Sequence, residues 1–424
     1  MAQAPQVNEK PHTPLAAYAA SALKTNQLTG DYARDQLRFG LFGEVGGLLG
    51  LVKKEHRDLE PADHNAITEE IGDALWYLAN VAQQYGTTLQ AAGAHAMNIL
   101  QLRMGITRAF ADEVTFEEFD ALLQLTSKTL SELDRLQHLR ELAEHAGQLL
   151  GPPSDKTDLL SAPPQNLLGE VLADLAMVAA LFGQKLADIA EANLRKIKSR
   201  WPGENPVHLP LFDEGILVFE QFPREFEMHY QEVVPKDGAP YVIQRIGGQI
   251  NVGDRLTDNR VGPDGYRFHD VFHLAYMVHL GWSPVIRALL KLKRKSDPSV
   301  DENQDGARAV IIEEAISTWI FNHAYARKFF ADKKPGRLNY DLLKQVHSMV
   351  GGYEVEDCPL WQWELAILDG FKVFRQLIEH GGGVVHVNLN TRTLEFSKLD
   401  RVQEPVHAAV ARAPLVGALP PPGV

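Results

Sequence analysis

Residues 43–47 read Gly-Glu-Val-Gly-Gly and residues 69–73 read Glu-Glu-Ile-Gly-Asp, each within an apolar run of helical spacing. Because residues three apart on a helix point the same way, Glu70 and Asp73 converge on one face, and a second helix that carries Glu44 can close an acidic cluster. Carboxylates among apolar neighbours repel one another unless a cation neutralises them, and Mg²⁺ prefers such oxygen ligands. The stretch therefore predicts two helices that hold a magnesium site. The alternative is a solvated, charged helix face.

This pattern resembles that of the MazG-like all-α nucleoside triphosphate pyrophosphohydrolases, which is Glu-x-x-Glu, a spacer, and then Glu-x-x-Asp. Gly47 stands where the family's second Glu would be. The resemblance covers about residues 30–203 and implies a helical bundle in which Glu44, Glu70 and Asp73 bind Mg²⁺. It also implies cleavage of a nucleoside triphosphate to a monophosphate and pyrophosphate, with Glu44 or Glu70 taking the proton of the attacking water.

A shift of the chain by 97 residues lays a second copy of this helical unit over the first. The repeat pairs Glu44 with Glu141, and it pairs Asp73 with Glu170. Each copy keeps three of the four acidic positions, but not the same three. The second copy therefore offers an alternative metal set, which is Glu141, Glu144 and Glu170.

The second copy ends in Asn193, Lys196 and Arg200, just before Trp201-Pro202. This segment resembles the family's closing Asn-x-x-Lys-x-x-x-Arg motif, which holds the substrate phosphates. A point charge and a planar guanidinium one turn apart suit a triphosphate. The alternative is a pair of basic residues at a helix C-terminus. If the two copies pair, their apolar helix faces are buried and Lys196 comes close to Asp73, which makes one composite site per chain.

Beyond residue 203 the pattern changes to a mixture of strands and helices. Strand-like alternation covers 226–234 and 241–252, and 384–396 reads as two strands that turn near Asn390-Thr391. Helical spacing covers 268–281, 307–330, 340–349 and 360–380. These elements predict an α+β domain, for which the sequence suggests no family.

This second domain carries a candidate metal site of its own. His269 and His273 lie four residues apart on a predicted helix, the spacing by which one helix face offers two nitrogens to a transition metal. Glu313 or Glu314 can supply a third ligand. The alternative is a hydrogen-bonded structural pair of histidines.

Composition limits the classes of function. The chain of 424 residues has a formal net charge of −13, which argues against direct nucleic-acid binding because phosphate contacts need clustered Lys and Arg. A single cysteine excludes an internal disulfide framework and fits a reducing compartment. Because residues 1–12 lack the apolar core of a signal peptide and no run reaches membrane-spanning length, we expect a cytoplasmic protein with no membrane partner.

The predicted fold class is mainly α, with a tandem-repeat MazG-like helical bundle followed by an α+β C-terminal domain. The predicted divisions are an N-terminal lead at 1–29, the tandem bundle at 30–203, the α+β domain at 204–400 and a Pro/Ala-rich tail at 401–424. Two functions remain open. One is a pyrophosphohydrolase that uses Mg²⁺; the other is a nucleotide-binding sensor whose eroded helical half regulates a metal-binding C-terminal domain. A homo-oligomer is compatible with either.

Overall fold

The computed structural model describes residues 13–124, 132–151 and 163–399, so the predicted tail lies outside the described residues. The chain divides into two compact units, Met1–Pro202 and Gly203–Val424, which are treated separately below. The first unit is helical, and the second combines helices with a small antiparallel sheet. The predicted fold class is therefore confirmed.

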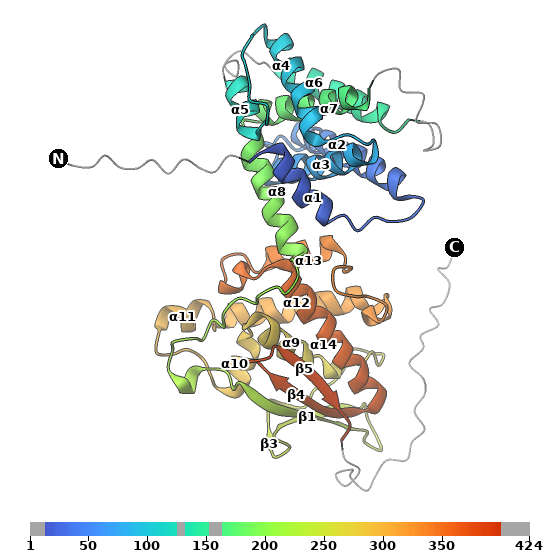
Figure 1. Cartoon of the computed structure of the whole chain (residues 1–424). Helices are drawn as coiled ribbons and strands as arrows, with labels where there is room; N and C mark the ends of the chain where they lie inside the picture. The colour runs from blue at the N-terminus through green and yellow to red at the C-terminus, as the bar shows by residue number, and fades with distance from the viewer. Residues whose placement is uncertain (1–12, 125–131, 152–162, 400–424) are drawn as a thin grey trace, which may run out of the picture. The chain divides into compact units, whose positions relative to one another are not determined.

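The first unit contains two consecutive sets of helices (Figure 1). The main helices of the two repeats, α3 and α7, end 97 positions apart, and the helices that follow them, α4 and α8, begin 97 positions apart. The bounds are α1 Leu15–Lys24, α2 Ala33–Asp58, α3 His64–Gln84, α4 Leu89–Met104, α5 Phe116–Gln124, α6 Glu132–Gln148, α7 Pro164–Leu181 and α8 Leu186–Arg200.

The turns between these helices repeat as well. Gly86 follows α3 with φ +68°, and Gly183 follows α7 with φ +70°. This left-handed conformation strains residues with a Cβ atom and favours glycine just beyond a helix end. At the start of α4, the Thr88 side chain accepts a hydrogen bond from Ala91 N and thereby caps the helix.

The two repeats exchange their last helices. Helix α4 packs mainly along α7, and α8 packs along α3, so each main helix is covered by the final helix of the other repeat. Glycines permit the close approach: a Cβ on Gly72 would lie 3.0 Å from Asn193 Cβ, and one on Gly169 would lie 2.7 Å from the His95 ring. The apolar faces of α3 and α7 are covered, and three equivalent residues on each helix are buried: Leu75, Leu78, Val81, Leu172, Leu175 and Val178.

Helix α1 is part of this bundle rather than of a separate lead. Leu15, Tyr18 and Ala22 lie on one stripe of α1 and are fully buried in the core of the unit. A helix of ten residues is marginal alone, so its order depends on this packing.

The second unit is built around a five-stranded antiparallel sheet in the order β3-β2-β1-β4-β5. The strands are β1 Glu225–Val233, β2 Tyr241–Ile246, β3 Ile250–Asn251, β4 Gly382–Asn388 and β5 Thr393–Ser397. Central strand β1 pairs with both β2 and β4, with Tyr230 opposite Gln244 on one side and Gly383 on the other. The run predicted as one strand at 241–252 turns at Gly247 and Gly248, both at positive φ, and becomes two.

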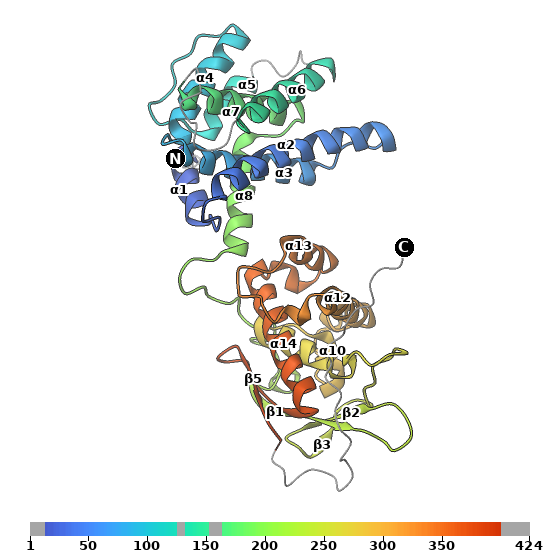
Figure 2. The same cartoon turned by 90° about the vertical axis from the view of Figure 1, so that its right-hand side faces the viewer.

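Helices cover one face of this sheet (Figure 2). They are α9 Asp270–Leu280, α10 Pro284–Leu290, α11 Pro298–Asn303, α12 Ala307–Tyr325, α13 Tyr340–Met349 and α14 Leu360–His380. Helices α9 and α14 pack against each other and against β4 and β5, which places α9 in the interior, with every residue from Asp270 to Leu280 buried. A candidate site that begins on α9 is therefore held by the core of the unit.

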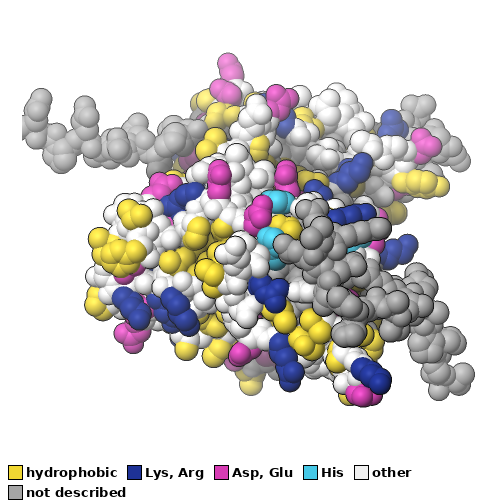
Figure 3. All heavy atoms as spheres, turned by 90° about the horizontal axis from the view of Figure 1, so that it is seen from below, with side chains coloured by type: hydrophobic (Ala, Val, Ile, Leu, Met, Phe, Trp, Pro, Cys, Tyr) yellow, Lys and Arg dark blue, Asp and Glu magenta, His cyan; other side chains and the backbone are white. Residues whose placement is uncertain are grey.

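The surface of the molecule is mixed in charge on the face seen in Figure 3, where basic side chains are scattered among acidic and hydrophobic ones. Among the described residues, no single helix is long and apolar enough to cross a membrane. Helices α7 and α8 pass that test only as a pair, and they are bent by 103° at their junction.

Candidate functional site

Asp73 on α3 receives two hydrogen bonds from α8. Lys196 Nζ lies 2.5 Å from Asp73 Oδ2, and Asn193 Nδ2 donates to Asp73 Oδ1 at 3.0 Å. Lys196 also contacts Glu69 Oε1 at 3.0 Å. The structure thus brings the predicted acidic face and two residues of the predicted phosphate-binding segment together within one chain.

Glu44 on α2 completes the acidic group. Burial raises the pKa of the Glu44 carboxyl to about 8, and the negative charge of Asp73 and a hydrogen bond with Glu70 add to the increase. Burial also raises the pKa of Asp73, although Lys196 and Asn193 oppose that shift. A carboxyl that keeps its proton at neutral pH lies where its surroundings would stabilise a further negative charge poorly.

Gly47 lies directly beneath the Glu70 carboxylate. A Cβ at Gly47 would clash with both carboxylate oxygens of Glu70. The missing family Glu and the present position of Glu70 are therefore mutually exclusive. Glu70 occupies space that a side chain at position 47 would need.

The donor set fits a hard cation. Glu44, Glu70 and Asp73 offer carboxylate oxygens, and the pKa of Glu44 is raised by burial and by its acidic neighbours despite the opposing charge of Lys196. The oxygens are less tightly gathered than in a formed metal site. Among the described residues, only His269, His273 and Glu314 bring three ligand atoms within 4.8 Å of one another.

Arg200 is buried one turn beyond Lys196, and its guanidinium lies 4.7 Å over the Trp201 ring. Its position is thus set by a cation–π contact near the end of α8.

The carboxylates of the second copy are paired with Arg103, which comes from the last helix of the first copy, and with His145 of the second copy. Arg103 on α4 lies 2.6 Å from Asp174 Oδ1 and 3.0 Å from Glu170 Oε2, and it reaches Glu141 at 4.0 Å. His145 Nδ1 lies 2.6 Å from Asp174 Oδ2, and this hydrogen bond raises the pKa of His145. Glu144, the remaining member of the predicted set, is exposed on α6.

Two residues of these networks escaped sequence analysis. Tyr18 donates to Asn193 Oδ1 at 2.8 Å and so orients the amide that contacts Asp73. In the sequence, this role was indicated by a tyrosine on an apolar helix stripe, because a buried phenol needs a hydrogen-bond partner. Asp174 had a similar signal as the single carboxylate within the apolar run 171–181 of α7, where it is fully buried.

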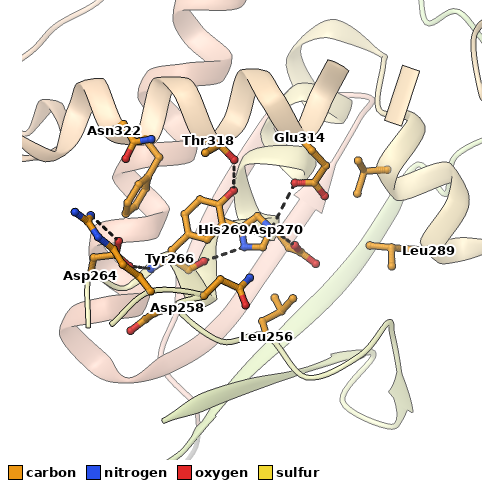
Figure 4. Close-up of a pocket in the computed structure, with 14 residues that line it drawn as sticks. Leu256, Asp258, Asp264, Tyr266, His269, Asp270, Leu289, Glu314, Thr318 and Asn322 are labelled. Carbon is orange, nitrogen blue, oxygen red and sulfur yellow. Dashed lines mark hydrogen bonds and ion pairs between the residues drawn. The ribbon is translucent and has the colours of Figure 1, made fainter. Parts of the chain in front are cut away.

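The C-terminal histidines meet at the junction of α9 and α12. His269 Nε2 and His273 Nε2 lie 3.8 and 3.6 Å from Glu314 Oε2. In Figure 4, His269 and Glu314 point toward each other. Both line a pocket of about 620 Å³. Both histidines and Glu314 thus converge as the sequence predicted, whereas Glu313 contacts the far side of the His273 ring.

His273 has two carboxylates beside it. Burial alone would lower the pKa of its imidazole, but Glu313 and Glu314 outweigh burial and hold the pKa well above its ordinary value. Without a metal, a protonated His273 offsets the negative charge of the two carboxylates beside it. The geometry is therefore compatible with the predicted metal and with the predicted hydrogen-bonded pair.

Comparisons with known proteins bear on the second unit. A search of curated proteins and a search of solved structures each gave no match. Residues 207–400, for which the sequence suggested no family, match the family described as the MazG C-terminal domain. The second unit is thus similar to the C-terminal domain of MazG proteins.

Proposed function

We propose that the first unit is a Mg²⁺-dependent nucleoside triphosphate pyrophosphohydrolase, with its site between α2, α3 and α8. The observation that carries the proposal is the contact of Lys196 and Asn193 with Asp73, because a carboxylate suited to bind Mg²⁺ and a cation suited to bind phosphate then lie side by side. The match of residues 207–400 to the MazG C-terminal domain supports the same class of protein.

Glu44, Glu70 and Asp73 would hold the ion. When bound, Mg²⁺ would neutralise the phosphate oxygens and make the α-phosphorus more electrophilic. Mg²⁺ binds the ionised carboxylate in preference to the protonated carboxyl, so loading the site requires Glu44 to lose its proton.

The remaining steps belong to the chain's own side chains. The remaining proton transfer belongs to Glu44 or Glu70, either of which would take the proton of the attacking water. Lys196 would turn from Glu69 and Asp73 toward the pyrophosphate and offset its charge, which its partly exposed side chain permits. Asn193, fixed by Tyr18, would keep Asp73 in place while Lys196 moves.

The second copy is assigned no chemistry in this proposal. Arg103 and His145 already provide positive charge to Glu170 and Asp174, so a cation there would have to displace a guanidinium. We infer that this copy acts as the structural partner of the first.

A nucleotide sensor is the second candidate. Gly47 favours it, because the site lacks one carboxylate of the family pattern and would hold a cation less tightly. In a sensor the nucleotide binds and is not cleaved.

The two candidates are separated by incubating the full chain with a panel of nucleoside triphosphates and Mg²⁺, and by measuring pyrophosphate and monophosphate. An enzyme releases both in equal amounts from at least one nucleotide. A sensor binds a nucleotide, as measured by calorimetry, and releases neither.

A further inference from the structure

We propose that His269, His273 and Glu314 bind one divalent transition-metal ion, and that this ion keeps an open coordination position for a small uncharged ligand in the adjoining pocket. The site lies wholly within the second unit and is independent of the pyrophosphohydrolase proposal. The three ligand atoms come from both α12 and the beginning of α9.

The first support is the orientation of His269. Its Nδ1 lies 2.9 Å from the Tyr266 carbonyl oxygen, which can only accept, so Nδ1 carries the proton and donates it. In the neutral ring, Nε2 then has the free lone pair that a metal needs. The Tyr266 ring stacks on the imidazole at 4.2 Å, and Thr318 fixes the Tyr266 hydroxyl at 2.7 Å.

His273 is oriented in the same way by Glu313. Its Nδ1 lies 2.8 Å from Glu313 Oε1, and Glu313 is held in turn by Ser283 Oγ and Val285 N. The opposite nitrogen, Nε2, is fully buried without a hydrogen-bond partner and faces Glu314. Metal-binding histidines usually donate their second nitrogen to a carboxylate or carbonyl in this way.

The distances fit a transition metal. Ligand atoms about 2.1 Å from a tetrahedral ion lie roughly 3.4 Å apart. The distances of 3.6 and 3.8 Å from Glu314 to the two histidines are close to that spacing, so small side-chain rotations suffice. Two imidazoles and one carboxylate favour a borderline ion such as Zn²⁺ over Mg²⁺, which prefers oxygen ligands.

The surroundings leave one side of the ion open. His273 is fully buried and His269 nearly so, but the Glu314 side chain is 40% exposed and lines the pocket. Asp270 Oδ1 lies 3.1 Å from His269 Nε2, while its other oxygen is held by Gln244. Three protein ligands beside a pocket are typical of catalytic sites, whereas structural zinc sites are closed by four.

The charges that line the pocket indicate which kind of ligand it can bind. The lining includes four carboxylates, and its single cation, Arg260, is already paired with Asp264 at 3.4 Å. A triphosphate would meet these carboxylates directly, so polyanions are disfavoured. Leu256, Leu289 and Phe321 provide apolar surface, and the volume of about 620 Å³ accommodates a small organic molecule.

The test uses the full chain stripped of metal by a chelator and then titrated with Co²⁺. Nitrogen-ligated Co²⁺ of low coordination number gives a visible band that oxygen-bound octahedral Co²⁺ shows only weakly, so the acidic site of the first unit does not mimic it. The wild-type protein should show the band at one equivalent. Glu314→Gln should lose it, and the matched control His386→Ala, on strand β4 outside the pocket, should keep it.

Two further measurements distinguish loss of the metal site from misfolding of the variant. Zn²⁺ should raise the Tm of the wild-type chain, because a ligand that binds only the folded state stabilises it. The Glu314→Gln chain should melt as the metal-free wild type does and should not respond to Zn²⁺. A wild-type chain with no Co²⁺ band and no Zn²⁺ effect on Tm would overturn the metal site.

Acetohydroxamic acid, which is uncharged at neutral pH, probes the open position. Added to the Co²⁺ form, it should bind the ion from the pocket as it gives up its N-hydroxyl proton to the solvent, and this binding should shift the visible band. An unchanged band would show a closed, structural site and would overturn the second half of the proposal.

Discussion

Lys196 Nζ lies 2.5 Å from Asp73 Oδ2, although 122 residues separate the two in the sequence. Helix α8 of the second repeat packs along α3 of the first, and Gly72 allows the two to approach closely. Glu170 of α7, the equivalent of Asp73, instead meets Arg103 of α4, which lies one turn beyond the position equivalent to Lys196. One fold thus builds two ion-pair sites, and only the first lies beside Glu44 and Glu70.

Lys196→Gln should weaken nucleotide binding while sparing Mg²⁺ binding, because Lys196 would contact phosphate and not the ion. Loss of a charge-assisted hydrogen bond costs about 1.5–3 kcal/mol, which corresponds to a KM raised by roughly 10-fold or more. The matched control is Lys198→Gln, an exposed residue on the same helix. Equal KM values for the two variants would remove Lys196 from the substrate site.

Mg²⁺ binding should release about one proton per chain at neutral pH. The pKa of Glu44 is raised to about 8, so below that pH the carboxyl is protonated and must give up its proton to bind the ion. Well above pH 8 the carboxyl is already ionised and the release should disappear. Calorimetry in buffers of different ionisation enthalpy measures the release, and Glu44→Gln should abolish it. Release that is independent of pH would contradict this assignment.

Gly47→Ala should lower the affinity for Mg²⁺ without lowering the stability of the protein. Alanine in place of a helical glycine commonly adds about 0.5–1 kcal/mol of stability. At Gly47 the new Cβ displaces the flexible end of Glu70, so Mg²⁺ affinity should fall while Tm stays the same or rises. Gly46→Ala, with open space at its Cβ, should raise Tm and leave affinity intact. Identical Mg²⁺ affinities in both variants would show that Mg²⁺ binding does not depend on the present position of Glu70.

Arg103→Met should destabilise the first unit by about 3 kcal/mol, because it leaves the fully buried Asp174 charged without its guanidinium. Urea unfolding measures the loss. Adding Asp174→Asn should recover part of it, since the buried charge is then removed too. A single variant as stable as the wild type would mean that His145 alone suffices.

The sequence predicted much of the fold because its signals are local. A repeat of 97 residues places equivalent helices and turns, and strand alternation located β1 and β4 within a few residues. Short α10 and α11 were missed, as each begins with proline after a capping Ser283 or Asp297 and has too few turns to show periodicity. The turn at Gly247 was missed because apolar residues continue on both sides of it.

The site was less predictable because it depends on partners far apart in the chain. Spacing placed Glu70 with Asp73 and His269 with His273, but it could not show that Glu313 orients His273 while Glu314 faces the pocket. Nor could it show that Arg103 serves the carboxylates of the second copy, since α4 and α7 meet only after the repeats exchange helices.

The central claim is tested most directly by Asp73→Asn and Glu170→Gln, which alter equivalent positions of the two repeats. Each removes one negative charge with little change of volume, so pyrophosphate release from nucleoside triphosphates under Mg²⁺ can be compared in folded proteins. We predict that Asp73→Asn abolishes release and that Glu170→Gln retains most of it. Release that survives Asp73→Asn, or that is lost only in Glu170→Gln, would contradict the assignment of the chemistry to the first repeat.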